Sequence, residues 1–350
     1  MVLCCACCGL TAALLPGQPV AIYHHLFGDG RRGAEGMDDL SEKNRKEDRQ
    51  DVNGANPDWG GGFGLSCADV RHIDASEIAE AVYKLCMKVT CVLPPENIAA
   101  LERAMEEEKS PQGRQALARI LENHRLAGEL MQPACQDTGI AVVFIELGQD
   151  VHVCGGDLNQ AIDEGVRRGY SEAYLRKSVV HDPLFGRVNT KDNTPAIVHL
   201  QMVPGCSLKI TVVAKGGGAE NMSGLAMLTP ASGVEGVRNF VVDQVRKAGP
   251  NACPPVIVGV GVGGNFETVA FLAKKALIRP VGERNPNPKY AALEEELLRE
   301  INGLGIGPQG FGGSVTALAV HIEAYPCHIA SLPVAVNLNC HVAPHSTVIL

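Results

Sequence analysis

Residues 251–267 read NACPPVIVGVGVGGNFE, an apolar run typical of a strand that ends in glycines and continues into a helix-forming segment. From Gly259 to Gly264 it fits G-x-G-x-x-G, the pattern that lets backbone approach a dinucleotide pyrophosphate, and Glu283 follows at about the 20-residue distance of a ribose-binding acid. That acid should end a second buried strand, whereas Pro280 interrupts the apolar run before it. We therefore expect a glycine-rich segment that packs closely against other backbone, and keep an NAD-binding oxidoreductase as the alternative.

Outward from this segment, capping and periodicity predict helices and strands over most of the chain. Asp74 followed by Glu77 is a capping-box pattern. The predicted helices cover 74–85, 95–108, 110–130, 158–175, 234–247, 266–277 and 290–302, and the predicted strands 142–147, 198–203, 208–214, 256–262, 315–322 and 330–338. We expect strands 198–203 and 208–214 to pair through the turn Pro204-Gly205. The prediction is an α/β (mixed α+β) fold in which residues 69–350 form one large domain of mixed sheets and helices.

Residues 1–68 have a different composition and are predicted to be a disordered, low-order N-terminal extension. Residues 28–64 contain mainly Gly, Asp, Glu, Arg, Lys and Asn, with little apolar periodicity. The apolar stretch before them has no positively charged start and is too short to span a bilayer, which argues against a signal peptide or a transmembrane helix. Met37 is a possible later start.

The overall composition limits the partners. The chain has 350 residues and a formal net charge of −8, which argues against capture of nucleic acid or an anionic membrane. Aromatic residues make up 4%, so bases would have few stacking surfaces. The 13 cysteines are odd in number and too dilute for a disulfide scaffold, which favours reduced thiols in a cytoplasmic protein.

The cysteines beyond the extension divide by their surroundings. Cys86, Cys91 and Cys154 lie in or beside apolar helix and strand patterns, which indicates small core residues. Three others lie in loops at the ends of predicted elements, where a scaffold presents reactive groups: Cys135, Cys253 and Cys340. No C-x-x-C pair occurs among the cysteines after residue 68, and the wide spacing alone leaves open whether these three share a metal.

Longer motifs identify a family. They are PACQDTG at 133–139, GVRRGYSEAYLRKS at 165–178, NTKDNTPA at 189–196, KGGGAENMS at 215–223, NACPPVIVGVGVGGNFE at 251–267, GIGPQGFGG at 305–313 and YPCHIASLPVAVNLNCH at 325–341. From about residue 71 to the C-terminus, the chain resembles the α-type catalytic part of the iron–sulfur-dependent hydro-lyases. These are the class I fumarate hydratases and the L(+)-tartrate dehydratases.

The resemblance implies a [4Fe–4S] cluster held by three cysteines, with one iron left open to act as a Lewis acid on the substrate. The implied reaction is the reversible hydration of fumarate to (S)-malate, and the alternative is the dehydration of L(+)-tartrate to oxaloacetate. By the same resemblance the metal ligands are Cys135, Cys253 and Cys340, the catalytic residues are Asp137 and His328, and the substrate-binding residues are Gln136, Arg176 and Gly217.

Two departures from the family pattern qualify the expected activity. Pro344 stands where the family commonly has Arg, which motivates a third hypothesis, a non-catalytic scaffold subunit. Single-chain members continue into a further swivelling domain that supplies more substrate-binding residues, whereas this sequence ends at Leu350. We therefore expect an α subunit that needs a β subunit carrying the swivelling domain, in an α2β2 assembly that acts on a small dicarboxylate.

Overall fold

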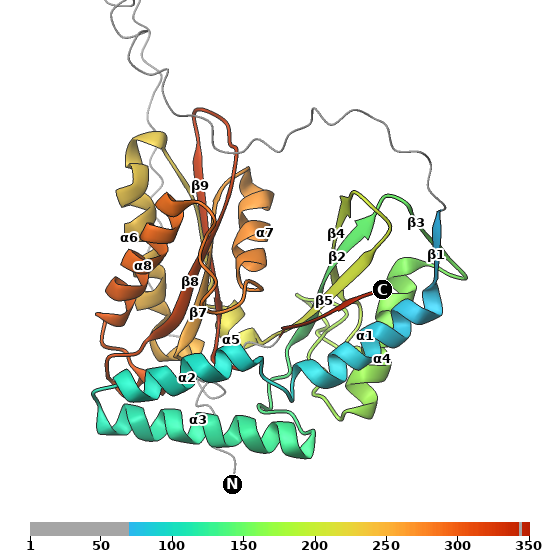
Figure 1. Ribbon diagram of the computed structural model, residues 1–350, viewed down its shortest axis with the longest axis horizontal. Coiled ribbons are helices and arrows are strands. Elements are labelled where there is room, and N and C mark those ends of the chain that lie inside the picture. Colours follow the sequence, from blue (N-terminus) through green and yellow to red (C-terminus); the bar gives the residue numbers. More distant parts are fainter. Residues whose placement is uncertain (1–69, 343–344) are drawn as a thin grey trace, which may run out of the picture. The chain divides into compact units, whose positions relative to one another are not determined.

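Several helices of the chain begin at capping residues that the sequence provides. In the computed structural model, which describes residues 70–342 and 345–350 (Figure 1), α1 (Ala75–Val89) starts at the predicted capping box of Asp74 and Glu77. Ser110 caps α3 (Pro111–Leu130) by accepting a hydrogen bond from Gly113 N at 3.2 Å. Each cap satisfies an amide that has no partner within its helix. The predictions for residues 1–68 and for Pro344 lie outside the described residues.

The first large sheet has the strand order β10-β5-β2-β4. Its members are β10 (His345–Ile349), β5 (Leu208–Lys215), β2 (Ile140–Gly148) and β4 (Ile197–Val203). The prediction that the strands now labelled β4 and β5 pair with each other is wrong, because β2 lies between them, parallel to β4 and antiparallel to β5. The reason is burial: β2 is apolar on both faces and therefore takes an interior position in the sheet.

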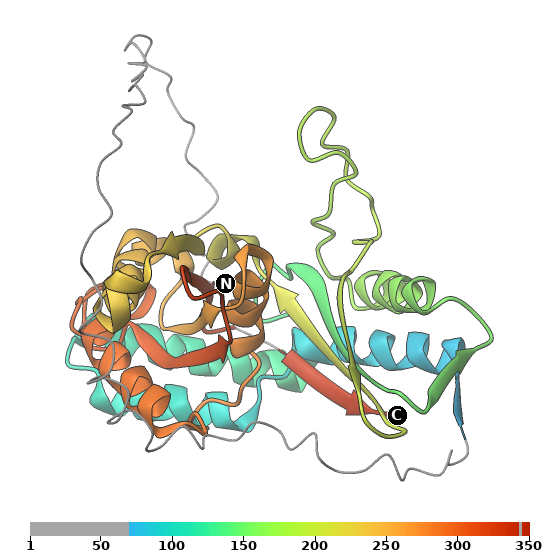
Figure 2. The ribbon, with the colours of Figure 1, turned by 90° about the horizontal axis from the view of Figure 1, so that it is seen from above.

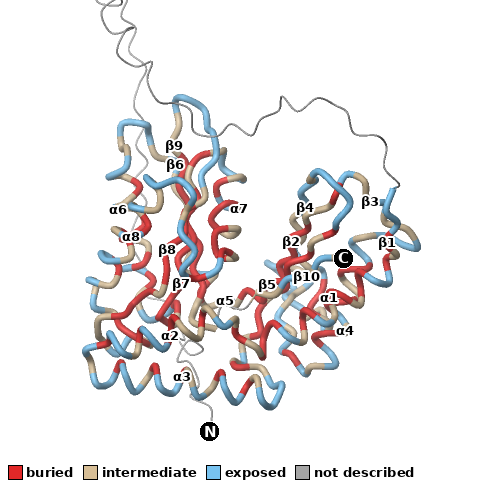
Figure 3. The backbone as a smooth tube through the Cα atoms, viewed as in Figure 1, coloured by how far each residue is buried: buried red, intermediate tan, exposed pale blue. Residues whose placement is uncertain are grey.

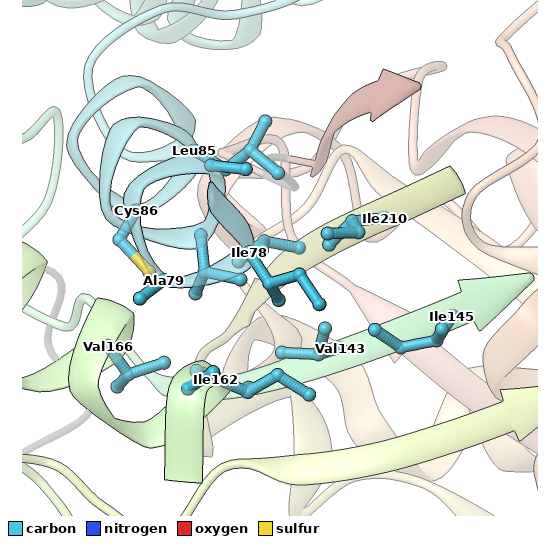
Figure 4. Close-up of a cluster of buried hydrophobic side chains, with 14 of the residues drawn as sticks. Ile78, Ala79, Leu85, Cys86, Val143, Ile145, Ile162, Val166 and Ile210 are labelled. Carbon is cyan, nitrogen blue, oxygen red and sulfur yellow. The ribbon is translucent and has the colours of Figure 1, made fainter. Parts of the chain in front are cut away.

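One face of this sheet packs against α1 and α4 (Leu158–Glu172). Figure 4 shows Ile78 and Leu85 of α1, Ile162 of α4 and Val143 of β2 meeting in one apolar cluster. The opposite face carries Phe144, which packs against α7 (Phe266–Ala276). Helix α7 therefore covers the face of the sheet that α1 and α4 leave open.

The second large sheet has the order β6-β9-β7-β8. Its strands are β6 (Gly224–Leu228), β9 (Leu332–Asn339), β7 (Val256–Gly263) and β8 (Ala317–Tyr325). One face packs against α7 and the other against α6 (Gly233–Ala248) and α8 (Pro288–Asn302). Figure 3 shows that the buried residues concentrate in these strands and on the helix faces turned towards them.

The glycines of residues 259–264 serve the packing of α7 against β7. A Cβ at Gly259 would lie 2.1 Å from Ala273 O, and one at Gly261 would lie 2.2 Å from Val269 O. Both glycines lie inside β7 instead of in the turn before the helix, where a dinucleotide fold uses them. Close backbone packing therefore accounts for the motif, as expected, and the structural basis for the NAD-binding alternative is removed.

Smaller elements complete the described part of the chain. They are α2 (Pro95–Glu107), the parallel pair β1 (Arg71–Asp74) and β3 (Val151–Cys154), the short helix α5 (Gly217–Glu220) and the 3-10 turns η1 (Pro230–Ser232), η2 (Gly249–Ala252) and η3 (Pro308–Gly310). The connection between α4 and β4 projects from the sheet as a long loop (Figure 2). None of the described helices is long and apolar enough to cross a bilayer. The mixed α/β architecture confirms the predicted fold class.

The cysteines predicted to be core residues are largely buried. Cys86 is 0% and Cys91 is 2% exposed, and burial raises the pKa of Cys86 to about 12. Such a thiol stays protonated and unreactive at neutral pH. Cys154 is only partly buried, so its assignment as a core residue holds in part.

Candidate active site

The loop of residues 133–139 is fixed from both sides, which positions Cys135. Ala134 N donates to Thr90 O at 3.0 Å, and Ala134 O accepts from Asn123 Nδ2 at 2.7 Å. Directly after this anchor, Asp137 N donates to Cys135 Sγ at 3.4 Å. An amide directed at sulfur favours the thiolate, the form of cysteine that binds metal.

The Asp137 carboxylate connects this loop to the end of β5. Its Oδ1 accepts from Gly139 N at 3.1 Å, and its Oδ2 accepts from Gly217 N at 2.9 Å. Gly139 has φ of +66°, and a Cβ there would lie 2.4 Å from Lys215 O. A glycine is therefore required for the close approach that brings Asp137 and Gly217 together.

Arg176 adjoins the same loop through its backbone. Thr138 Oγ1 donates to Arg176 O at 3.1 Å, and the buried Tyr170 hydroxyl donates to Thr138 O at 2.8 Å. Gln136 precedes Asp137 in the loop, and its Oε1 lies 3.7 Å from Cys135 Sγ. The structure therefore places the backbone of Arg176 against the loop that carries Gln136 and the predicted ligand Cys135.

The other two predicted ligands meet at one end of the second sheet. Cys253 precedes β7 by three residues, and Cys340 directly follows β9. These strands are antiparallel, with Ile257 opposite Asn339, so the start of one lies beside the end of the other. Strand pairing alone therefore places two cysteines that are far apart in sequence at the same end of the sheet.

The loop that carries Cys253 is held by the segment 305–313. Gln309 donates to Pro254 O through its backbone N at 2.8 Å and its Nε2 at 2.9 Å. Cys253 itself has φ of +54°, a left-handed conformation that needs support from its surroundings. The GIGPQGFGG motif thus supports the backbone beside this cysteine.

The short segment from Lys215 to Glu220 contacts elements that adjoin each of the three cysteines. Its Gly217 binds Asp137 of the Cys135 loop, and its helix α5 contacts both η2, which precedes Cys253, and β9, which precedes Cys340. Figure 1 shows α5 near the lower ends of β5 and β7. This segment is the point where the two sheets and the three cysteine loops converge.

Two charged residues of this segment form a buried network that the sequence did not reveal. Lys215 Nζ lies 3.1 Å from Glu220 Oε2, and Asn337 Nδ2 donates to the same oxygen at 2.9 Å, while Lys274 pairs with Oε1. Burial alone would raise the pKa of Glu220, but the ammonium groups of Lys215 and Lys274 bring that pKa down to about 2. Burial lowers the pKa of Lys215, and the negative charge of Glu220 acts against that shift.

His328 is the one predicted site residue that the chain keeps apart from the others. It lies in the connection between β8 and β9, at the end of the sheet where Gly263 pairs with Tyr325. Its ring Nδ1 accepts from Ala330 N at 3.1 Å, and the side chain is exposed. The eight residues of β7 extend about 25 Å, so within one chain His328 cannot reach Cys340 at the other end.

Three cysteine side chains are donors of the kind that hold an iron–sulfur cluster. Over residues 70–342 and 345–350, no three His, Cys, Asp or Glu side chains lie close enough to share one metal ion. A single ion needs all its ligands at about 2.0–2.3 Å, whereas cysteines on different irons of a cluster bind separate atoms. Three cysteines around one segment, one of them receiving a backbone amide on its sulfur, are compatible with the second arrangement.

Comparison with known proteins places the chain among enzymes. A sequence model of the family described as fumarate hydratase (Fumerase) matches residues 79–349. A protein of Methanocaldococcus jannaschii with the provisional name L(+)-tartrate dehydratase subunit alpha is 41% identical over 270 residues, which are 75% of this chain and 94% of that protein. L(+)-tartrate dehydratase subunit alpha of Escherichia coli (strain K12) is 35% identical over 269 residues, which are 76% of this chain and 88% of that protein. The chain belongs to the fumarate hydratase (Fumerase) family of hydro-lyases.

Proposed function

We propose that the chain is the catalytic α subunit of a [4Fe–4S]-dependent hydro-lyase that adds water reversibly to fumarate, giving (S)-malate. One observation carries the proposal: Asp137, two residues from Cys135, is hydrogen-bonded to Gly217 in the segment that also borders the loops of Cys253 and Cys340. We propose that the Asp137 carboxylate, the three thiols and these backbone amides act at one site, as addition of water beside a carboxylate requires. Membership of the fumarate hydratase family supports the same reaction class.

Cys135, Cys253 and Cys340 are the residues that we propose to hold the cluster. When bound, the cluster supplies a Lewis acid, at the iron without a protein ligand, for a carboxylate and the hydroxyl of the substrate. The amide of Asp137 favours the Cys135 thiolate by donating to its sulfur at 3.4 Å. Because an open iron is readily oxidised, we propose that the protein works in a reducing compartment, the cytoplasm.

Asp137 is the proposed acid–base residue. In the dehydration direction it accepts the proton from the carbon next to the hydroxyl-bearing carbon as hydroxide leaves, and in hydration it returns that proton. Both its oxygens accept backbone amides, from Gly139 and Gly217, so its orientation is set before the substrate arrives. Gly217 is also a proposed substrate contact. A substrate carboxylate that takes over the Gly217 amide would free Oδ2 of Asp137 for proton transfer.

Arg176 and Gln136 are the proposed substrate-binding side chains. A guanidinium binds a carboxylate through two parallel N–H groups, which fixes the direction of a dicarboxylate. The backbone of Arg176 is tied to Thr138 of the Asp137 loop at 3.1 Å, which supports a role for its side chain near the acid–base residue. Gln136 adds an amide that can donate to the second carboxylate or to the hydroxyl.

His328 stays a proposed catalytic residue on the resemblance alone. Because its loop lies at the opposite end of the sheet from Cys340, it can serve this site only if another copy of the chain delivers it. The proposed α2β2 assembly offers such a second copy. The β subunit, which we propose to carry the swivelling domain, would supply the remaining substrate contacts. The names of the relatives, which call them alpha subunits, support a second kind of subunit.

The dehydration of L(+)-tartrate to oxaloacetate is the second candidate reaction. The relatives from Methanocaldococcus jannaschii and Escherichia coli favour it, because their names refer to this activity. Both reactions remove a hydroxyl and a neighbouring proton from a four-carbon dicarboxylate. The same acid–base group and carboxylate clamp can therefore serve either substrate.

The test is anaerobic co-expression of the chain with its β partner. The purified complex should be brown, should bleach in air, and should contain iron and sulfide. The ratio kcat/KM for fumarate, (S)-malate and L(+)-tartrate then assigns the substrate. Cys253→Ser should abolish turnover, and Asp137→Asn should lower kcat about 100-fold or more. The control Cys206→Ser, at an exposed cysteine, should leave turnover and kcat unchanged.

Two outcomes would contradict the proposal in different ways. Full turnover by Cys253→Ser would show that the reaction does not need the cluster. A wild-type complex that holds a cluster but turns over none of the three substrates would support the scaffold hypothesis instead.

A further inference from the structure

Lys215 is a buried ammonium next to a proposed cluster ligand. Its side chain is 0% exposed at the end of β5, and its Nζ lies 3.1 Å from Glu220 Oε2. Among the described residues, this Nζ makes no hydrogen bond of good geometry. An ammonium has three N–H donors, so the ion pair with one carboxylate oxygen leaves donors for another acceptor.

The surroundings of Lys215 indicate where that acceptor lies. Glu220, which holds Lys215, accepts at 2.9 Å from Asn337, three residues before Cys340 on β9. Ser223, just after α5, accepts from Leu338 N at 3.3 Å. The end of β9 that leads into Cys340 is thus attached to the segment around Lys215.

Glu220 has partners other than Lys215. The same carboxylate is paired with Lys274 of α7, through Oε1, and hydrogen-bonded to Asn337. Removing a second ammonium from water carries a desolvation penalty that an ion pair often fails to offset. A nearby anionic centre would use the charge and the N–H donors that the ion pair with Glu220 leaves to Lys215.

We propose that Lys215 is a positioning residue for the cluster: held by Glu220, its ammonium presents positive charge and N–H donors to the sulfur of Cys340, which retains the cluster and raises its reduction potential. The inference rests on the cluster proposed above. Groups around metal ligands commonly change metal affinity by 10–100-fold, and charge near the sulfurs sets the potential of iron–sulfur clusters. Loss of a nearby cation makes the more negative, reduced state less favourable and so lowers the potential.

The test compares Lys215→Met with the matched control Lys274→Met in the full chain. Each removes one ammonium from Glu220, but Lys274 reaches the carboxylate from α7. After anaerobic reconstitution, iron and sulfide per chain, the rate of iron loss to a chelator and the reduction potential are measured. We expect Lys215→Met to lose iron about tenfold faster and to have a lower potential, and Lys274→Met to resemble the wild type. Circular dichroism checks that each variant is folded.

A second pair of variants covers the case in which the methionine variant does not fold. Lys215→Gln keeps a donor for Glu220 without the charge and should reproduce the loss, whereas Lys215→Arg should restore both readouts. If folded Lys215→Met or Lys215→Gln keeps the iron content and the reduction potential of the wild type, the proposed role of Lys215 is wrong. It is also wrong if Lys274→Met changes iron loss and potential as much as Lys215→Met does. A wild-type chain that takes up no iron and sulfide would instead refute the cluster itself, and with it this inference.

Discussion

Replacing Glu108 by alanine tests how the site loops are supported. Glu108 is 0% exposed and accepts from Ser110 N at 2.8 Å, from Ser314 N at 2.9 and 3.0 Å, and from Val315 N at 2.9 Å. It therefore ties the connection between α2 and α3 to residues 305–315, the segment whose Gln309 holds the backbone beside Cys253.

The expected magnitude follows from these contacts. Glu108→Ala leaves three backbone amides without their acceptor, and each unsatisfied buried group costs about 1–3 kcal/mol, so the variant should lose about 3–9 kcal/mol of unfolding free energy. Burial would raise the pKa of Glu108, but the amides of Ser110, Ser314 and Val315 bring it below its usual value. The folded pKa is thus depressed, so the stabilisation is present above the ordinary carboxyl pKa and is lost as pH falls through the folded pKa.

Urea unfolding of the full chain, followed by circular dichroism between pH 7 and pH 4, measures the effect. The control is Glu106→Ala, at an exposed position on the same helix, which should change stability by less than about 0.5 kcal/mol. The difference between wild type and Glu108→Ala should shrink towards acid pH. A loss below about 1 kcal/mol at pH 7, or a difference that grows on acidification, would refute the reasoning.

Three further predictions concern the packing, the substrate and the pH response. Gly261→Ala places a methyl group 2.2 Å from Val269 O and should lower stability by about 2–4 kcal/mol in thermal unfolding; an unchanged Tm would contradict the packing of α7 on β7. Arg176→Lys should raise KM for the dicarboxylate about tenfold with a smaller fall in kcat, and an unaltered KM in steady-state kinetics would remove Arg176 from the clamp. Burial lowers the pKa of His321 to about 4. As the pH falls, the unfolded state therefore binds a proton at this residue before the folded state does. The wild type should lose about 2 kcal/mol of unfolding free energy from this effect between pH 7 and pH 5. His321→Gln should flatten that slope, and an equal slope in both proteins would contradict it.

Local structure was predictable where one residue decides it. Asp74 and Ser110 satisfy free amides at helix starts, and both helices begin within one residue of the predicted position. The role of the glycines in β7 was also predictable. A Cβ on either Gly259 or Gly261 would lie about 2 Å from a backbone oxygen of α7, so only glycine permits this packing. In both cases the physical requirement and the residue that meets it are neighbours in the sequence or on one strand.

Strand order was not predictable in the same way. The strands that became β4 and β5 are separated by four residues, and a short turn between strands usually means that they pair. Strand β2 lies between them because it is apolar on both faces, and this is evident only when β2 is compared with β4 and β5. This comparison involves residues some sixty positions apart, which a local pattern does not contain.

The candidate site also has features that follow from local sequence and features that follow only from the tertiary fold. Cys135 and Asp137 share a loop, so their proximity follows from the chain, and Cys253 and Cys340 share a sheet end only because β7 and β9 pair antiparallel. Lys215 in KGGGAE has the sequence of a solvated charge at a strand end, yet its side chain is 0% exposed and pairs with Glu220, which also pairs with Lys274. The burial of this cation, in a segment attached to the strand that leads into Cys340, is thus a property of the tertiary fold. For this reason we expect Lys215 to affect the chemistry of Cys340 as well as the stability of the chain.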